Sequence, residues 1–372
     1  MTPPSLIAHI HTSGHPMVLC ITGGSSAIAA LLEVPGGSAS VLEAIVPYSG
    51  AALNEWLGGP VDHYCSERTA RAMAMAAFER ARQLSTADSH TLIGIGATAS
   101  LVSNRPKRGP HRIYVAWQTS RRTAAASCEL TKGARTRAEE EGVATQLIIS
   151  AIAEACELHH HEVELQQAGD SLRRRDQVAL PTWTQLLLGE RAHVDAASPT
   201  GEFEQPPHVL FPGAFNPIHD GHRRMARLAA SRLGRPVTFE LSIANVDKPP
   251  LDFLEIADRL SQFTGERVLL TRAPRFVEKA RLAPACTFVV GVDTITRIGD
   301  AKYYGGGTAE RDAAFAALAA SGCRFLVFGR HMGGQFLTLS AVAIPPALRQ
   351  LCDEISEEDF REDVSSTSLR KA

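Results

Sequence analysis

The chain has 372 residues, a length that suggests two domains. Hydrophobic residues make up 44% of it and charged residues 21%, which is typical of a globular protein. The net charge of -2 excludes the broad positive field with which many proteins hold nucleic acid or a membrane surface.

The cysteines and the apolar runs indicate the cellular compartment and the kinds of site to expect. The seven cysteines show no C-x-x-C spacing, which argues against zinc sites and against a disulfide framework, and fits a reducing compartment. No apolar run approaches a membrane span, and the first 32 residues contain no Lys or Arg, so we expect no signal or transit peptide. We therefore expect a cytoplasmic protein without membrane or nucleic-acid partners.

The first predicted unit is a strand at residues 17–21, a glycine turn and a helix. The turn reads Thr22-Gly23-Gly24, and a strand, glycine turn and helix in this order can cradle a phosphate. A plain turn with Ser25 as helix cap explains the same residues, so both interpretations stay open.

A second glycine-rich stretch lies further along. Residues 94–99 follow a predicted strand at 92–95 and nearly fit G-x-G-x-x-A, the dinucleotide-binding fingerprint. That fingerprint needs an acidic residue about 20 residues later, whereas the next one is Glu129. We reject the fingerprint, and we expect a further strand at 113–117 and a long helix over 135–158.

The order of these pieces resembles the C-terminal domain of the CinA proteins, a family of nicotinamide-mononucleotide amidases. The matching pieces are Thr22-Gly23-Gly24, Val34-Pro35-Gly36, Tyr48-Ser49, the helix from Ser66 to Met73 and the start of the helix at Arg135. The resemblance implies an α/β domain over residues 1–165. It also implies a candidate site that contains Cys20, Thr22, Gly23, Gly24 and Tyr48.

Two departures from that family affect the chemistry. The family uses a serine nucleophile two residues before Thr-Gly-Gly, where this chain has Cys20, and a lysine base soon after the Tyr-Ser pair. Here no Lys or Arg occurs between Tyr48 and Arg68. A thiol acts as nucleophile when a neighbour lowers its pKa, so we interpret Cys20 as a buried structural residue and the site as altered.

Residues 166–206 are predicted to be a connector with some helix around Trp183. The triple arginine at 173–175 reads as a solvated face, and we expect no metal site at the three histidines 159–161, because adjacent helical residues point in different directions.

The most informative stretch of the second half is Phe211 to His222. A short apolar run precedes it and an amphipathic helix follows, so it reads as strand, turn and helix start. Gly213 permits a tight turn close to a ligand. His219 and His222 are three residues apart and share one face of the helix start, where backbone N–H groups attract anions.

This stretch matches G-x-F-x-P-x-H-x-G-H, and it is similar to the signature of nucleotidyltransferases with an H-x-G-H loop. The resemblance implies a Rossmann-like parallel-sheet domain over residues 207–372. It also implies that His219 and His222 act on the nucleotide phosphates and that Gly213 and Phe215 belong to the nucleotide site.

Two more candidates follow predicted strands. Lys248 comes after the β-rich run 237–242, and Asp293 comes after the apolar run 288–292. Ligands bind beyond the carboxyl ends of parallel strands, so both residues are candidates for nucleotide binding. A role for Asp293 as a simple helix cap is an equally good interpretation.

The chain closes with Val364-Ser-Ser-Thr-Ser-Leu-Arg370, which is similar to the I-S-S-T-x-x-R motif of nicotinamide- and nicotinate-mononucleotide adenylyltransferases. The resemblance assigns Ser366, Thr367 and Arg370 to phosphate binding, as hydroxyls and a guanidinium at a helix start allow.

Together these resemblances predict an adenylyltransferase that joins ATP, with Mg²⁺ on its phosphates, to a mononucleotide, with nicotinamide mononucleotide favoured. The implied partners are small-molecule nucleotides, and a homo-oligomer is left open. Two alternatives remain. A cytidylyltransferase shares the histidine loop but usually closes with R-T-x-G-I-S-T, and a non-catalytic pyridine-nucleotide sensor would keep the folds without the activity.

Overall fold

The computed structural model describes residues 3–104, 108–159, 163, 165, 167–202, 205–332 and 335–361. The chain divides into two compact units. The first comprises the chain up to Leu188 together with Asp247–Ala257, and the second comprises Gly189–Val246 together with the chain from Asp258 onward. Within the described ranges, no helix combines the length and apolarity needed to cross a membrane.

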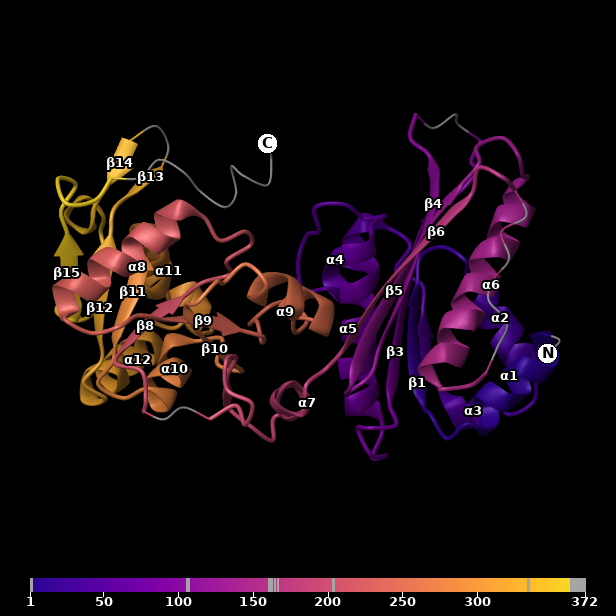
Figure 1. Ribbon diagram of the computed structural model, residues 1–372, viewed down its shortest axis with the longest axis horizontal. Coiled ribbons are helices and arrows are strands. Elements are labelled where there is room, and N and C mark those ends of the chain that lie inside the picture. Colours follow the sequence, from indigo (N-terminus) through magenta and orange to yellow (C-terminus); the bar gives the residue numbers. More distant parts are fainter. Residues whose placement is uncertain are drawn as a thin grey trace. The chain divides into compact units, whose positions relative to one another are not determined.

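A six-stranded sheet forms the centre of the first unit (Figure 1). Its strands, in spatial order, are β2 (Val41–Ile45), β1 (Met17–Ile21), β3 (Ile93–Ser100), β4 (His111–Gln118), β5 (Arg122–Leu130) and β6 (Ser171–Val178). Strand β1 runs parallel to both of its neighbours, and the pairs from β3 to β6 are antiparallel. The expected α/β domain is confirmed, with a mixed sheet.

Helices cover both faces of this sheet. The helices of this unit are α1 (Pro3–Thr12), α2 (Ser26–Glu33), α3 (Gly37–Ser40), α4 (Gly50–Trp56), α5 (Glu67–Leu84), α6 (Arg137–Ala155) and α7 (Pro181–Leu188). Apolar residues of α1, α2 and α6 share one core with β1 and β3, whereas alanines of α5 pack with β4 and β5 on the other side. Helix α6 begins with a capping box between Thr136 and Glu139, which explains its start at the predicted place.

The glycine-rich stretch at 94–99 is part of strand β3, which extends to Ser100, beyond the predicted end of the strand at residue 95. A Cβ on Gly94 would lie 2.1 Å from the carbonyl oxygen of Ala74, and one on Gly96 would lie 2.2 Å from that of Ala70. The two glycines therefore let α5 lie directly on the strand, which agrees with rejecting the dinucleotide fingerprint.

The expected connector at 166–206 contains regular structure. Strand β6 carries the triple arginine and pairs with β5, and α7 forms where helix was expected around Trp183. Arg174 and Arg175 form ion pairs with Glu154 and Glu67, respectively, so the arginines lie on a solvated sheet edge tied to neighbouring helices.

The second unit contains a seven-stranded sheet. Its strands, in spatial order, are β15 (Cys352–Ile355), β12 (Arg324–Phe328), β11 (Thr287–Gly291), β8 (Val209–Pro212), β9 (Thr238–Ser242), β10 (Arg267–Thr271) and β7 (His193–Asp195). All neighbours are parallel except β7, which runs antiparallel to β10. This confirms the predicted parallel sheet.

Helices pack on both faces of the second sheet. They include α8 (Asp220–Leu233), α10 (Phe276–Leu282), α11 (Val292–Gly299) and α12 (Thr308–Ala320). This unit also contains α13 (Pro346–Arg349), the short helices η1 (Ala301–Tyr304) and η2 (Leu339–Ala341), and a hairpin of β13 (Arg330–Met332) and β14 (Gln335–Leu337). Helix α9 (Phe253–Leu260) begins in the first unit and ends in the second. Alternate residues of β11 point to opposite faces: Phe288 packs with α10 and α12, whereas Val289 packs with α8.

The chain order of this sheet determines where a ligand can bind. From β8 the chain adds β9 and β10 on one side, and then β11, β12 and β15 on the other. Such a reversal leaves a crevice outside the carboxyl ends of β8 and β11, because the connections leave the two strands in opposite directions. The histidine loop follows β8 and Asp293 follows β11, so both lie at this reversal.

Candidate functional site

The loop between β8 and α8 is fixed by an aromatic cluster. The backbone N–H of Gly213 donates a hydrogen bond to the carbonyl oxygen of Glu240, 3.0 Å away, and a Cβ on Gly213 would lie 2.5 Å from the ring of Phe215. Phe215 has a φ of 45°, in the left-handed region, and its buried ring packs edge-on against Phe211 and Phe239. Phe215, which was expected in the nucleotide site, thus packs against Phe211 and Phe239 and holds the loop in place.

The two histidines meet at the start of α8, as their spacing predicts. His219 is the residue before the helix and His222 lies in its first turn. Their rings stack with centroids 3.8 Å apart, and the backbone N–H of His219 donates to Nδ1 of His222 at 3.3 Å. The ring of Phe215 packs edge-on against His222, with centroids 5.2 Å apart. Packing and hydrogen bonding therefore fix the His222 ring.

His222 is neutral near pH 7. Burial lowers its pKa to about 3, helped by the positive charges of His219, Arg330 and Arg223. Since Nδ1 accepts a hydrogen bond, the proton of the neutral ring is assigned to Nε2. His222 is therefore a neutral hydrogen-bond donor, suited to an anionic oxygen.

A cavity of about 210 Å³ lies beside these histidines. Its lining comes from four places: the end of β8 with the histidine loop and α8, the end of β11 with α11, the segment after β12, and Phe360 beyond β15. The lining residues are Phe211, Pro212, Gly213, Ala214, Phe215, His219, Gly221, His222, Met225, Gly291, Asp293, Thr294, Arg297, Gly329, Arg330 and Phe360. The cavity therefore occupies the place where the strand order reverses, and it brings together Gly213, Phe215, both histidines and Asp293.

Asp293 is tied to two arginines at this cavity. Its Oδ2 lies 2.8 Å from Nη1 of Arg330 and 3.7 Å from Nη2 of Arg297. The residue before α11 is Gly291, and it makes no side-chain cap, while Asp293 lies within the first turn. The simple cap is therefore the wrong interpretation of Asp293, whose carboxylate instead holds Arg330 at the cavity.

Arg330, Arg297 and Thr294 were missed by reasoning from the sequence. A signal for Arg330 existed, because it follows the apolar run of β12 and so belongs to the same sheet edge as Asp293. The alternation of strands and helices alone did not show that this strand lies beside β11, and that adjacency brings Arg330 to Asp293.

Among the described residues, Lys248 was also predicted to bind phosphate, and it is not part of this cavity lining. Lys248 belongs to the first compact unit, where its Cε would lie 3.6 Å from a Cβ on Gly59. Ser366, Thr367 and Arg370 lie outside the described residues. Their assignment to phosphate binding stays a prediction.

The candidate site in the first unit is closely packed. Cys20 is fully buried in β1, and burial raises the pKa of its thiol far above the usual range, so it is a poor nucleophile. A Cβ on Gly23 would lie 2.5 Å from that of Ala99, and one on Gly24 would lie 2.5 Å from Cδ1 of Ile148. These glycines allow close packing, whereas Tyr48 is 74% exposed.

A carboxylate occupies the anion position at the start of α2. The backbone N–H of Ser26 donates to Oε1 of Glu141 at 3.3 Å, and Oγ of Ser25 donates to the same oxygen at 3.4 Å. The backbone N–H of Thr22 is bonded to the carbonyl oxygen of Ala97 at 2.8 Å. Ser25 makes no side-chain cap. Glu141 of α6 thus places a carboxylate at the start of α2, where an anion was expected, and Ser25 occupies the N-cap position of a turn without a side-chain cap. Phosphate binding by this turn stays a prediction.

Acidic, cysteine and histidine side chains do not gather into a metal site in the part of the chain that the structure describes. Of the three adjacent histidines, His159 follows the end of α6, and the other two lie outside the described residues.

Comparison with known protein families finds a similarity for the second half of the chain. Residues 210–372 match the family model described as cytidylyltransferase-like. No curated protein matches the chain.

Solved structures similar to the chain carry CinA-type titles. One is the competence/damage-inducible protein CihA from Agrobacterium tumefaciens, with 19% identity over 41% of this chain and 94% of that chain, and a TM-score of 0.34. Another is a CinA superfamily protein from Escherichia coli, with 16% identity over 41% of this chain and 87% of that chain, and a TM-score of 0.33. The match of residues 210–372 to the cytidylyltransferase-like family supports nucleotidyl transfer as the class of activity of this part of the chain.

Proposed function

We propose that the C-terminal domain is an adenylyltransferase that joins ATP to nicotinamide mononucleotide and releases pyrophosphate. The observation that carries nucleotidyl transfer is the pair His219 and His222 at the start of α8, facing a cavity at the reversal of the strand order. The choice of ATP rests on the closing segment at 364–370, which resembles that of mononucleotide adenylyltransferases. The choice of acceptor rests on the resemblance of the first half to nicotinamide-mononucleotide amidases.

In this reaction a phosphate oxygen of the mononucleotide attacks the α-phosphorus of ATP. A new P–O bond forms, the bond to the bridging oxygen of the β-phosphate breaks, and pyrophosphate leaves with that electron pair. The site must hold both phosphates in line and stabilise the charge that develops. It needs no nucleophilic side chain.

The residues at the cavity suit this task. The neutral His222 donates from Nε2, and its hydrogen-bonded, packed ring needs little rearrangement. The N-terminus of α8 adds backbone N–H groups and the positive end of the helix dipole. Arg330 supplies a cation, and the ion pair with Asp293 holds it in place.

The described part of the cavity lining offers few carboxylates that could bind a metal ion, which suits a metal ion bound to the phosphates of the substrate. The described lining residues include a single carboxylate, Asp293, which already pairs with Arg330. Mg²⁺ prefers to keep several waters and to bind substrate phosphates, so we assign it to the triphosphate of ATP. Its contribution there is to neutralise phosphate charge.

The direct test offers the purified full-length chain ATP or CTP with Mg²⁺ and a panel of mononucleotides that includes nicotinamide and nicotinate mononucleotide. Mass spectrometry identifies the products. The proposal expects a dinucleotide of adenylate and nicotinamide mononucleotide, together with pyrophosphate. Exclusive use of CTP would favour the cytidylyltransferase alternative, and nucleotide binding without any product would favour the sensor.

A further inference from the structure

Helix α9 runs from one compact unit into the other. Its residues up to Ala257 belong to the first unit, and those from Asp258 onward belong to the second. An isolated helix of eight residues is unstable in water, so its start and position depend on the groups bonded to its ends.

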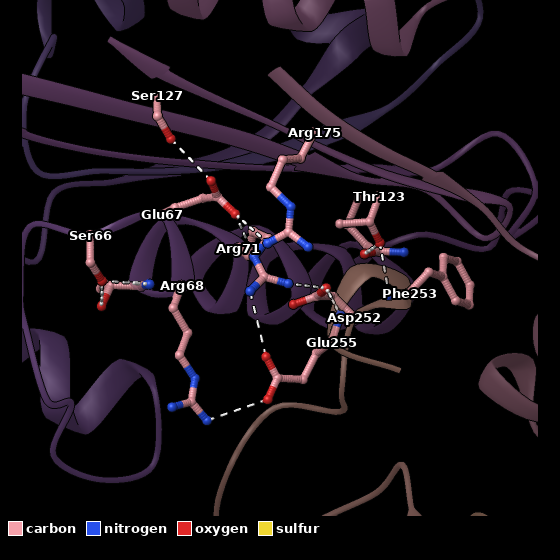
Figure 2. A network of polar contacts seen from close by, with 12 residues as sticks. Ser66, Glu67, Arg68, Arg71, Thr123, Ser127, Arg175, Asp252, Phe253 and Glu255 are labelled. Atoms are coloured by element: carbon pink, nitrogen blue, oxygen red, sulfur yellow. Dashed lines mark hydrogen bonds and ion pairs between the residues drawn. The ribbon is translucent and has the colours of Figure 1, made fainter. Parts of the chain in front are cut away.

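The first turn of α9 is bound by residues of the N-terminal half (Figure 2). The buried guanidinium of Arg71 lies 2.7 Å from Oδ1 of Asp252 and 3.5 Å from Oε2 of Glu255. The backbone N–H of Phe253 donates to Oγ1 of Thr123 at 3.0 Å, and that of Glu255 donates to Oδ1 of Asp252 at 2.9 Å. The N-terminal half thus supplies one helix cap directly and holds the other through Arg71.

Other contacts extend this attachment. Glu67 accepts hydrogen bonds from Ser127 and Arg175, each at 3.1 Å, and its Oε1 lies 3.6 Å from Nε of Arg71 (Figure 2). Leu254 packs among the alanines of α5, β4 and β5, and the ring of Phe253 stacks on Trp183. The buried arginine therefore lies among three carboxylates, of which those of Asp252 and Glu255 are buried and that of Glu67 is partly exposed, beside an apolar contact.

The other end of the helix is bonded to the histidine loop. Nη1 of Arg259 donates to the carbonyl oxygen of Ala214 at 3.0 Å. Just beyond the helix, the side-chain oxygen of Gln262 accepts the backbone N–H of Ile218 at 3.0 Å. Ala214 and Ile218 bracket the turn that leads to His219. Helix α9 and Gln262, two residues beyond its end, therefore hold the turn that presents the histidines.

We propose that Arg71, in the N-terminal half, is a positioning residue for the nucleotide site of the C-terminal half and acts through α9. It fixes the first turn of the helix through Asp252 and Glu255, and the far end of the same helix fixes the loop at 214–218. The effect on turnover rests on the proposed function, whereas the effect on loop order does not.

The test is hydrogen exchange of the full-length protein, followed by mass spectrometry of peptides. Arg71→Met removes the charge while keeping a long side chain. Arg80→Met is the matched control, because Arg80 lies on the same helix and pairs with Glu43 at 2.8 Å outside the cluster. We expect Arg71→Met to accelerate exchange in the peptide spanning 214–222 by about tenfold, corresponding to roughly 1.4 kcal/mol of local stability, with the strands β8, β11 and β12 unchanged. The control should leave this peptide at the wild-type rate.

A more conservative variant keeps the test informative if Arg71→Met fails to fold. Arg71→Lys keeps the charge but loses the planar fork that reaches several carboxylates, so it should give an intermediate exchange rate. Wild-type exchange at 214–222 in both Arg71 variants would overturn the proposal, and so would uniform acceleration across the strands of the second sheet, which would show general destabilisation.

Kinetics supply an independent readout. With an active substrate pair, Arg71→Met should lower kcat about tenfold or more with a smaller change in the acceptor KM, because misplaced histidines stabilise the transition state less well. Faster loop exchange in a protein without any transferase activity would refute the proposed function and leave the positioning role standing. Normal kcat beside faster exchange would refute the catalytic part of the positioning role.

Discussion

Replacing His222 with alanine removes the donor that the structure places most firmly at the cavity. In the wild type, the ring accepts the backbone N–H of His219 at 3.3 Å and packs edge-on against Phe211 and Phe215. The variant loses the Nε2–H donor, the stacking with His219 and part of the aromatic contact. It should therefore affect both catalysis and stability.

The magnitude follows from the role of the donor. Loss of one preorganised donor to a charged transition state costs about 100- to 1,000-fold in kcat, or about 3–4 kcal/mol. The neutral state of His222, with a pKa near 3, means that this loss should be the same from pH 6 to pH 8. A histidine that acted as a cation would instead show a loss that grows as the pH falls.

The assay is the initial rate of dinucleotide formation at saturating ATP and acceptor, with a thermal melt to confirm folding. The control is His208→Ala, because His208 precedes β8 and so lies at the opposite end of that strand from the cavity. Wild-type kcat in a folded His222→Ala variant would refute the assignment of this donor. A comparable loss in His208→Ala would show that the effect is general.

Three other predictions concern different parts of the protein. Arg330→Ala should raise the nucleotide KM about tenfold in steady-state kinetics, since a charge-assisted bond to phosphate contributes about 1.5–3 kcal/mol, and an unchanged KM would remove Arg330 from the site. Arg370→Ala should raise the apparent dissociation constant for ATP by roughly tenfold in titrations, with partial recovery in Arg370→Lys, and unchanged affinity would separate the closing segment from phosphate binding. When the pH falls from 7 to 5, the free energy of unfolding of the wild type should decrease by about 2 kcal/mol more than that of His222→Gln. The reason is that the unfolded histidine, with a pKa near 6.5, takes up a proton that the folded ring, with a pKa near 3, does not. Denaturant titrations measure both free energies, and parallel pH profiles would contradict the low pKa.

Local patterns predicted much of the fold. The apolar run at 17–21 is β1 with the same bounds, and His219 and His222 lie at a helix start as their spacing indicated. Strands β5 and β6 were not predicted. In β6 the run Arg173-Arg174-Arg175 is polar on both faces, so a period-2 pattern is absent, and pairing with β5 forms the strand.

The candidate sites were harder to predict from the sequence than the fold, because they depend on tertiary contacts. The glycine turn at 22–24 has the pattern of a phosphate cradle, yet Glu141, more than a hundred residues away in the chain, occupies the start of α2. Lys248 follows a strand as expected, but its segment packs with the N-terminal half. Neither contact has a signal in the local sequence, because each depends on a partner that the fold brings from elsewhere.

The measurement that tests the central claim most directly is mass spectrometry of the products formed by the purified chain from ATP, Mg²⁺ and nicotinamide mononucleotide, with His222→Ala run in parallel. The account predicts a dinucleotide whose mass is that of AMP plus nicotinamide mononucleotide less one water, as a phosphoanhydride requires, together with equimolar pyrophosphate. At least about 100-fold less of both should come from the variant. Absence of this dinucleotide from the wild type, or equal amounts from the variant, would contradict it.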